Sequence, residues 1–174
     1  MKLPLAAAAA LAALALSGCS DPPRAVAQPE PAAFEPEAQG EGPVVFLRGR
    51  AEGQHVVLEV VARDAADVHG IAFRVGYDPG EMTFVDATSG GAWTSQSVAL
   101  AREGAPGQVA VVWSEKGSAL GVDAREETTL GTLRFDLRGR KGTAVTFRTD
   151  RSQILDSKGA PLAVSWYGGA VPAR

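Results

Sequence analysis

The chain has 174 residues, a single cysteine and a formal net charge of −3, from 17 basic and 20 acidic side chains. A single cysteine excludes an internal disulfide and a zinc site built on several thiolates, so a fold of this length must be stabilised by an apolar core. The charge is uneven, since residues 20–43 carry five acids and one arginine, whereas acids and bases balance from Val44 onward. The near-neutral body gives no reason to expect nucleic-acid binding.

Residues 1–18 are predicted to be a secretory signal peptide. Lys2 precedes an apolar run of alanine and leucine that ends at Leu16 and is too short to span about 30 Å of hydrocarbon comfortably. The block Leu16-Ser17-Gly18-Cys19 resembles the lipobox of bacterial lipoproteins, which implies that cleavage makes Cys19 the lipidated N-terminus. We therefore expect a lipid-anchored protein of the bacterial cell envelope. Ser20 favours the outer over the inner membrane in a cell that has both. An ordinary secretory signal and a short transmembrane anchor are the alternatives.

Residues 19–43 are predicted to be a lipidated, disordered spacer. They are rich in Pro, Ala, Glu and Gln and have few groups to bury, so the segment should stay extended. Beside a lipid anchor it would hold the following domain away from the membrane. Phe34 is its only aromatic residue.

The pattern from Val44 to Arg174 is typical of a single all-β domain. Short apolar runs recur about every ten residues between clusters of Gly, Asp and Pro, and many of them alternate: Phe73 and Val75 share one face and Arg74 lies on the other. No window after the signal peptide shows sustained helical periodicity. About nine strands predict a two-sheet antiparallel β-sandwich. They span residues 44–47, 55–62, 71–77, 82–85, 97–101, 109–113, 130–137, 144–147 and 162–167.

Four parts of this domain resemble a cohesin domain. The matching parts are Glu59 to Ala62 followed by His69 to Pro79 and Met82 to Phe84, then Gly107 to Ser114, Leu130 to Leu137, and Asp156 to Gly159 with Leu162 to Gly169. The resemblance spans nearly all of residues 44–174. It implies a jelly-roll sandwich, and a family role of binding dockerin modules through one sheet face. Related sandwiches also occur in carbohydrate-binding modules, so the fold alone leaves the ligand open.

The resemblance also suggests binding residues. It places the strands at 71–77, 109–113 and 130–137 in the partner-contacting sheet, and alternation then directs four charged side chains outward. These are Arg74, Arg134, Asp136 and Arg138. Exposed guanidinium groups are plausible contact points, although a solvated face with cross-strand charge pairs would look the same in the sequence. The leading hypothesis is a membrane-tethered, non-catalytic module that captures a protein partner, such as a dockerin-bearing protein.

Two other functions fit the sequence. A carbohydrate-binding lipoprotein would use exposed aromatic rings, of which Trp93 in a glycine-rich loop is the best candidate. Trp113 and one of Trp166 and Tyr167 should instead fill the core, because adjacent residues on a strand point to opposite faces. The third hypothesis is a structural envelope protein that uses the sandwich only for subunit packing.

No pattern predicts an enzyme, a cofactor or a metal site. His55 and His69 begin separate strands without other ligands at metal-binding spacing. Asp64 and Asp67 flank a strand connection, where aspartate more often caps a turn than binds calcium. No serine has the Gly-x-Ser-x-Gly setting of a nucleophile, and no pair of carboxylates stands out for glycoside hydrolysis.

Overall fold

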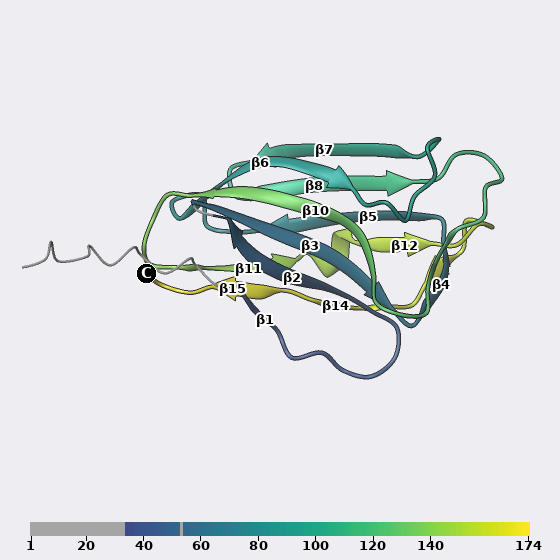
Figure 1. The fold of residues 1–174 in the computed structure, drawn as a ribbon, viewed down its shortest axis with the longest axis horizontal. Coiled ribbons are helices and arrows are strands. Elements are labelled where there is room, and N and C mark those ends of the chain that lie inside the picture. The colour runs from purple at the N-terminus through teal and green to yellow at the C-terminus, as the bar shows by residue number, and fades with distance from the viewer. Residues whose placement is uncertain (1–33, 53) are drawn as a thin grey trace, which may run out of the picture.

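The structure is a computed structural model that describes residues 34–52 and 54–174 (Figure 1). The predicted signal peptide, Cys19 and residues 19–33 of the predicted spacer lie outside the described residues. The described residues form fifteen strands and one short 3-10 helix, η1 (Thr149–Arg151). Among them, no helix is long and apolar enough to cross a membrane.

Most of the strands belong to two packed sheets. The first sheet has eight strands, and its main path runs through β1 (Glu35–Pro36), β15 (Gly169–Val171), β11 (Thr143–Phe147), β5 (Gly70–Gly76), β12 (Gln153–Leu155) and β13 (Pro161–Leu162). On the other side of β5 the sheet continues through β8 (Gln108–Ser114) to the edge strand β7 (Val98–Ala105). Figure 1 shows β7 along the upper edge of the molecule and β15 on the opposite side.

The second sheet has five strands. Its order is β14 (Ser165–Tyr167), β2 (Val44–Glu52), β3 (His55–Arg63), β10 (Thr128–Leu137) and β6 (Met82–Ser89). Only the β14–β2 pair is parallel. The short strands β4 (Ala65–Val68) and β9 (Val122–Ala124) pair with each other. The predicted all-β sandwich is confirmed, and each predicted strand has a counterpart. The last one divides into β13 and β14 because the chain crosses from one sheet to the other there.

Strand alternation builds the core between the two sheets. The inward residues of β5 and β10 are fully or almost fully buried, whereas Arg74 on β5 is exposed. Aromatic rings from both sheets meet at the centre. The ring centroids of Phe73 and Trp113 lie 5.4 Å apart, and those of Tyr77 and Phe135 lie 5.1 Å apart, both edge to face. This is a favoured geometry for aromatic pairs. The Phe73–Trp113 pair lies within the first sheet, and the Tyr77–Phe135 pair links the end of β5 to β10 of the second sheet.

The domain begins earlier than the predicted boundary at Val44. Phe34 is buried in the main core, and β1 pairs with β15. Two glycines make room for this ring, because a Cβ atom on Gly49 or on Gly169 would overlap the Phe34 side chain. The part of the predicted spacer from Phe34 to Pro43 is therefore packed on the sandwich. Polar composition does not reveal this packing, because a single large aromatic ring can anchor a polar segment.

The segment at 37–43 also covers an apolar cluster on the outer face of the second sheet. Val44, Phe46 and Val61 are buried there with Tyr167 packed against them. The Arg63 guanidinium donates hydrogen bonds to the Gln39 side chain and the Gly40 carbonyl, each at 3.1 Å. This arrangement explains why four consecutive residues of β2 are apolar: Val45 and Leu47 face the main core, and Val44 and Phe46 face the covering segment.

Candidate binding face

The outward face of β5, β8 and β7 presents an unusual apolar surface. In the register of these strands Ala72 lies opposite Val112, and Val112 lies opposite Leu100. Leu100 is 63% exposed and Val112 is 39% exposed, so this row is open to solvent. Solvent-facing strand positions are usually polar, and adjacent exposed apolar side chains often mark an interaction surface. This row is the centre of the candidate binding face.

The next row along the same face is basic. Arg74 lies opposite Ala110, and Ala110 lies opposite Arg102 on β7. Both arginines are exposed. They line a depression of about 360 Å³ together with Ala110, Gln108 and residues of the β7–β8 turn. The face therefore combines an apolar row with a row that ends in two guanidinium groups.

The exposure of Leu100 follows from the position of β7. The strand is an edge of the first sheet, since it pairs only with β8. Ala99 and Ala101 are also exposed. Their neighbours on β8, Trp113 and Val111, point into the core. Thus β7 extends beyond the cover of the second sheet and offers both of its faces to solvent. The sequence predicted a strand here but did not single out Leu100, Val112 or Arg102, because an exposed edge has the same alternation as a covered one.

The four predicted binding residues do not lie on one face, and this expectation was wrong. Arg74 belongs to β5 of the first sheet, whereas Arg134 and Asp136 belong to β10 of the second sheet. Their outward sides face opposite directions from the sandwich. Arg138 follows β10 and lines a separate depression at the end of the molecule with Tyr77 and Glu103. Alternation predicted which side of each strand faces outward, but sheet membership depends on long-range pairing.

One of the outward charged residues of β10 has a cross-strand partner. Asp136 lies opposite His55 in the register, and the two side chains form a close hydrogen-bonded pair. Arg134 lies between Val57 on β3 and Asp86 on β6, and it is only partly exposed. Its Nε atom is buried without a hydrogen-bond partner. This part of the second sheet thus matches the alternative of a face with cross-strand charge pairs.

Trp93 does not form the exposed platform that was predicted for carbohydrate binding. Its side chain is 7% exposed and belongs to the main core. The indole N–H donates to the Leu130 carbonyl oxygen at 2.6 Å. As predicted, Trp113 fills the core, and of the adjacent pair Trp166 packs against the main core while Tyr167 packs against the outer cluster.

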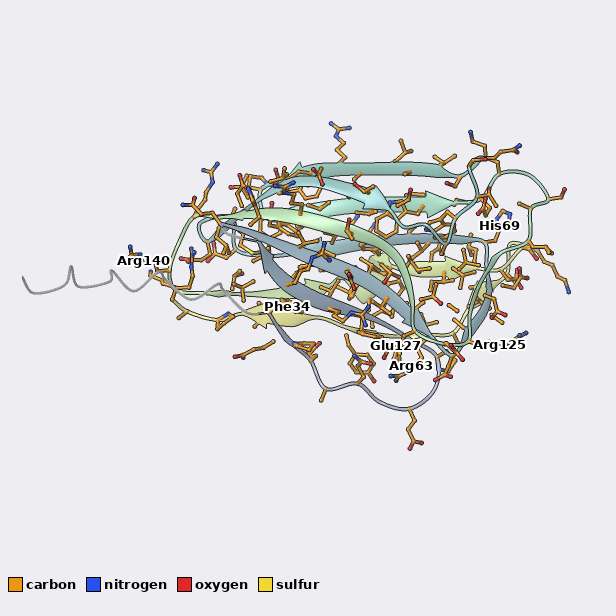
Figure 2. All side chains as sticks on the ribbon, in the orientation of Figure 1. Phe34, Arg63, His69, Arg125, Glu127 and Arg140 are labelled. Atoms are coloured by element: carbon orange, nitrogen blue, oxygen red, sulfur yellow. The ribbon has the colours of Figure 1, made fainter. Side chains whose placement is uncertain are left out.

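The described residues contain no group of three His, Cys, Asp or Glu side chains that could hold a metal ion. His55 pairs with Asp136, and His69 and Arg140 lie at opposite ends of the molecule (Figure 2).

Asp67 accepts hydrogen bonds from the Ser157 hydroxyl at 2.6 Å and from the Gly121 N–H at 3.0 Å. These bonds, with that of the Ser157 hydroxyl the strongest, lower the pKa of the Asp67 carboxyl below its usual value. As a hydrogen-bond acceptor, Asp67 thus joins β4 to the two loops that contain Gly121 and Ser157.

A second carboxylate has a structural role that the sequence did not reveal. Glu115 follows β8 and is 5% exposed. It accepts hydrogen bonds from the Thr94 backbone N–H, at 2.6 Å, and from the Thr94 hydroxyl. This contact holds the loop that places Trp93 in the core.

A family model described as the cohesin domain matches residues 47–160, which is more than half of the chain. The chain belongs to the cohesin family. A search of curated proteins finds no significant match. Solved structures of cohesins share the fold at low sequence identity. One of them is the sixth cohesin of scaffoldin B from Acetivibrio cellulolyticus, solved with a Cel5 dockerin mutant. It is 15% identical to this chain with a TM-score of 0.61, and the match covers 82% of this chain and 99% of that cohesin.

Two other cohesins extend this comparison. A cohesin of Clostridium acetobutylicum, solved in solution, is 14% identical with a TM-score of 0.61, and the match covers 76% of this chain and 92% of its own. A non-cellulosomal cohesin from the archaeon Archaeoglobus fulgidus is 17% identical with a TM-score of 0.56. The match covers 74% of this chain and 89% of the archaeal chain. At these identities the likeness shows that this cohesin shares the jelly-roll fold.

Proposed function

We propose that this cohesin is a non-catalytic protein-binding module that captures a dockerin-type partner at the cell envelope. The observation that carries the proposal is the solvent-exposed apolar row of Ala72, Val112 and Leu100 on β5, β8 and β7. Burying such a row against a partner is favourable by about 25 cal/mol for each Å² of apolar surface. Cohesin relatives of the same fold have been solved with dockerins, which supports a dockerin as the partner class.

The cellular setting is the second part of the proposal. The lipobox-like block ending in Cys19 would anchor the chain in an envelope membrane, and residues 20–33 would link the anchor to the sandwich. The packed N-terminal segment enters the domain at β1, next to β15, whereas β7 forms the opposite edge of the first sheet. The candidate row and the tether thus belong to different edges of that sheet.

The test is a binding measurement between the full-length chain and a panel of dockerin modules. Replacing Leu100 and Val112 together by serine should weaken the best binder at least ~10-fold, since the centre of an interface usually contributes most of the binding energy. Val85→Ser is the matched control, because Val85 is 43% exposed but lies on β6 of the other sheet. The control should bind within about twofold of the wild type. Absence of any binder in the panel, or wild-type affinity of the double variant, would contradict the proposal.

Carbohydrate binding remains a second candidate because of a different surface. A groove of about 510 Å³ lies along residues 161–167, Thr149, Ser152 and Gln153. Its lining includes Trp166 and Tyr167 and contains no charged side chain. Aromatic rings with a few polar groups suit a neutral ligand such as a polysaccharide chain. Retardation of the wild type on polysaccharide gels, lost in Gln153→Ala and Tyr167→Ala, would support this candidate. Unretarded migration of the wild type on the whole gel panel would exclude it.

A further inference from the structure

Arg74 and Arg102 form a row with a single alanine between them. Both side chains project from the outward face, on strands that lie either side of β8, and Ala110 is opposite each of them. Neighbouring strands lie about 4.8 Å apart, so the two arginines start about 10 Å from each other. The small Ala110 side chain forms the floor of the depression between them.

The two guanidinium groups lack counter-charges in the described part of the chain. None of the outward residues of β5, β8 and β7 is acidic. Glu103 is next to Arg102 in sequence but points to the other side of the strand, where it accepts hydrogen bonds from the Tyr77 hydroxyl and the Gly107 N–H. Neither arginine has a side-chain hydrogen bond or an ion pair within the described residues.

Several other surface arginines have an acidic partner. Arg48 pairs with Glu59 at 2.8 Å, Arg63 lies 3.7 Å from Glu127, and Arg125 pairs with Asp123 at 3.0 Å. Figure 2 shows Arg63 and Glu127 side by side on the face away from β7. A chain with a net charge of −3 has enough carboxylates to neutralise its arginines locally. Arg134, Arg138 and Arg140 also have no ion pair within the described residues, so the row at Ala110 is distinguished by placing two such arginines either side of one alanine on a single sheet face.

We propose that Arg74 and Arg102 bind carboxylate side chains of the protein partner. Each planar guanidinium can donate two parallel hydrogen bonds to one carboxylate, which gives orientation as well as attraction. The neighbouring apolar row of Val112 and Leu100 would bury the partner's apolar side chains at the same time. The partner surface that fits this face thus has an apolar ridge with acidic side chains beside it. This inference rests on the proposed function and specifies the chemistry of its partner.

The charge requirement can be tested without a partner, with succinate as the probe. Arginine Nε–H signals of the full-length chain in detergent are followed by NMR during titration with succinate, with chloride adjusted to keep the ionic strength constant. The signals of Arg74 and Arg102 should shift in a saturable way, and each single variant, Arg74→Gln or Arg102→Gln, should raise the apparent Kd reported by the remaining arginine at least ~10-fold. Arg140→Gln is the control, because Arg140 is exposed and lies in the connection between β10 and β11, outside the row (Figure 2). Equal shifts of Arg74, Arg102 and Arg140 would overturn the inference.

The second arm uses the best dockerin module from the panel and separates the two proposals. Four proteins are compared: the wild type, the Leu100 and Val112 serine variant, the Arg74 and Arg102 glutamine variant and Arg140→Gln. A ~10-fold loss in both double variants, with a weaker salt dependence of association in the glutamine variant, supports the inference. Loss in the serine variant alone overturns the role of the arginines and leaves the proposed function standing. Unchanged affinity in both double variants, or no binder in the panel, overturns the proposed function and with it the assignment of the partner's chemistry.

Discussion

The indole N–H of Trp93 donates a hydrogen bond to the backbone carbonyl oxygen of Leu130, at 2.6 Å. The same carbonyl oxygen also accepts a hydrogen bond from the Gly90 backbone N–H at 2.8 Å, so two groups of the β6–β7 loop bind to one buried residue. These bonds fasten the loop to β10 of the second sheet. The same loop precedes β7, which carries the exposed Leu100. Trp93 thus supports the candidate binding face from inside the domain and takes no direct part in binding.

Trp93→Ala should therefore lower stability. The expected loss in the free energy of unfolding is about 3–5 kcal/mol, since a large buried ring is removed and its cavity remains. Trp93→Phe keeps most of the ring and should cost less, mainly through the lost donor to Leu130. Urea denaturation of the three proteins measures both values. A Trp93→Ala protein with wild-type stability and reduced affinity for polysaccharide would contradict the buried role.

Phe34 should anchor the N-terminal segment. Phe34→Ala is expected to lower the free energy of unfolding by about 3–5 kcal/mol, because its ring belongs to the main core. Glu35→Ala is the control, since Glu35 is exposed on the same short strand and should change stability by less than about 0.5 kcal/mol. Thermal denaturation compares the two. If a chain that begins at Val44 were as stable as one that begins at Phe34, the packed segment would add nothing to the fold.

Stability at high pH should depend on Tyr77. Burial, followed by the hydrogen bond to the Glu103 carboxylate, raises the pKa of the Tyr77 hydroxyl to about 12. A raised pKa in the folded state means that the folded protein holds this proton more tightly than the unfolded chain does. The stabilisation is therefore complete below about pH 10, the usual tyrosine pKa, and is lost as the pH rises through about 12.

Tyr77→Phe removes this dependence. The wild type should be more stable than Tyr77→Phe at about pH 8, and the difference should shrink between about pH 10 and 12. Denaturant unfolding of both proteins across this range gives the difference directly, and other alkaline effects cancel in the comparison. A difference that stays constant with pH would show that Tyr77 ionises with an ordinary pKa.

Cys19 should carry the lipid anchor. Cys19→Ser removes the only thiol of the chain, so lipid attachment and release of the signal peptide by the lipoprotein route should both stop. Incorporation of labelled palmitate measures the first effect, and the apparent mass of the product measures the second. Ser20→Ala keeps the thiol and should still be labelled. Equal labelling of the wild type and Cys19→Ser would refute the assignment.

The local pattern of residues determined the strands and their inward faces. In β5 and β10, alternating apolar residues predicted the buried side chains correctly, because the pleat turns successive residues to opposite sides. Turn-forming residues between the runs predicted where most strands end. The same pattern, with its resemblance to cohesins, was enough to predict an all-β sandwich of this family, which the family model confirms.

The tertiary structure alone decided which side chains share a face. Arg74 and Arg134 have equivalent patterns in the sequence, but pairing across the chain puts β5 and β10 in different sheets, and Arg74 instead shares a row with Arg102. Phe34 lies in a segment of polar composition, yet Gly49 and Gly169 leave the space in which its ring is buried. Both outcomes depend on contacts between residues far apart in the sequence. Alternation reports only the two sides of one strand, so it carries no information about which strand becomes its neighbour or what covers its outer side.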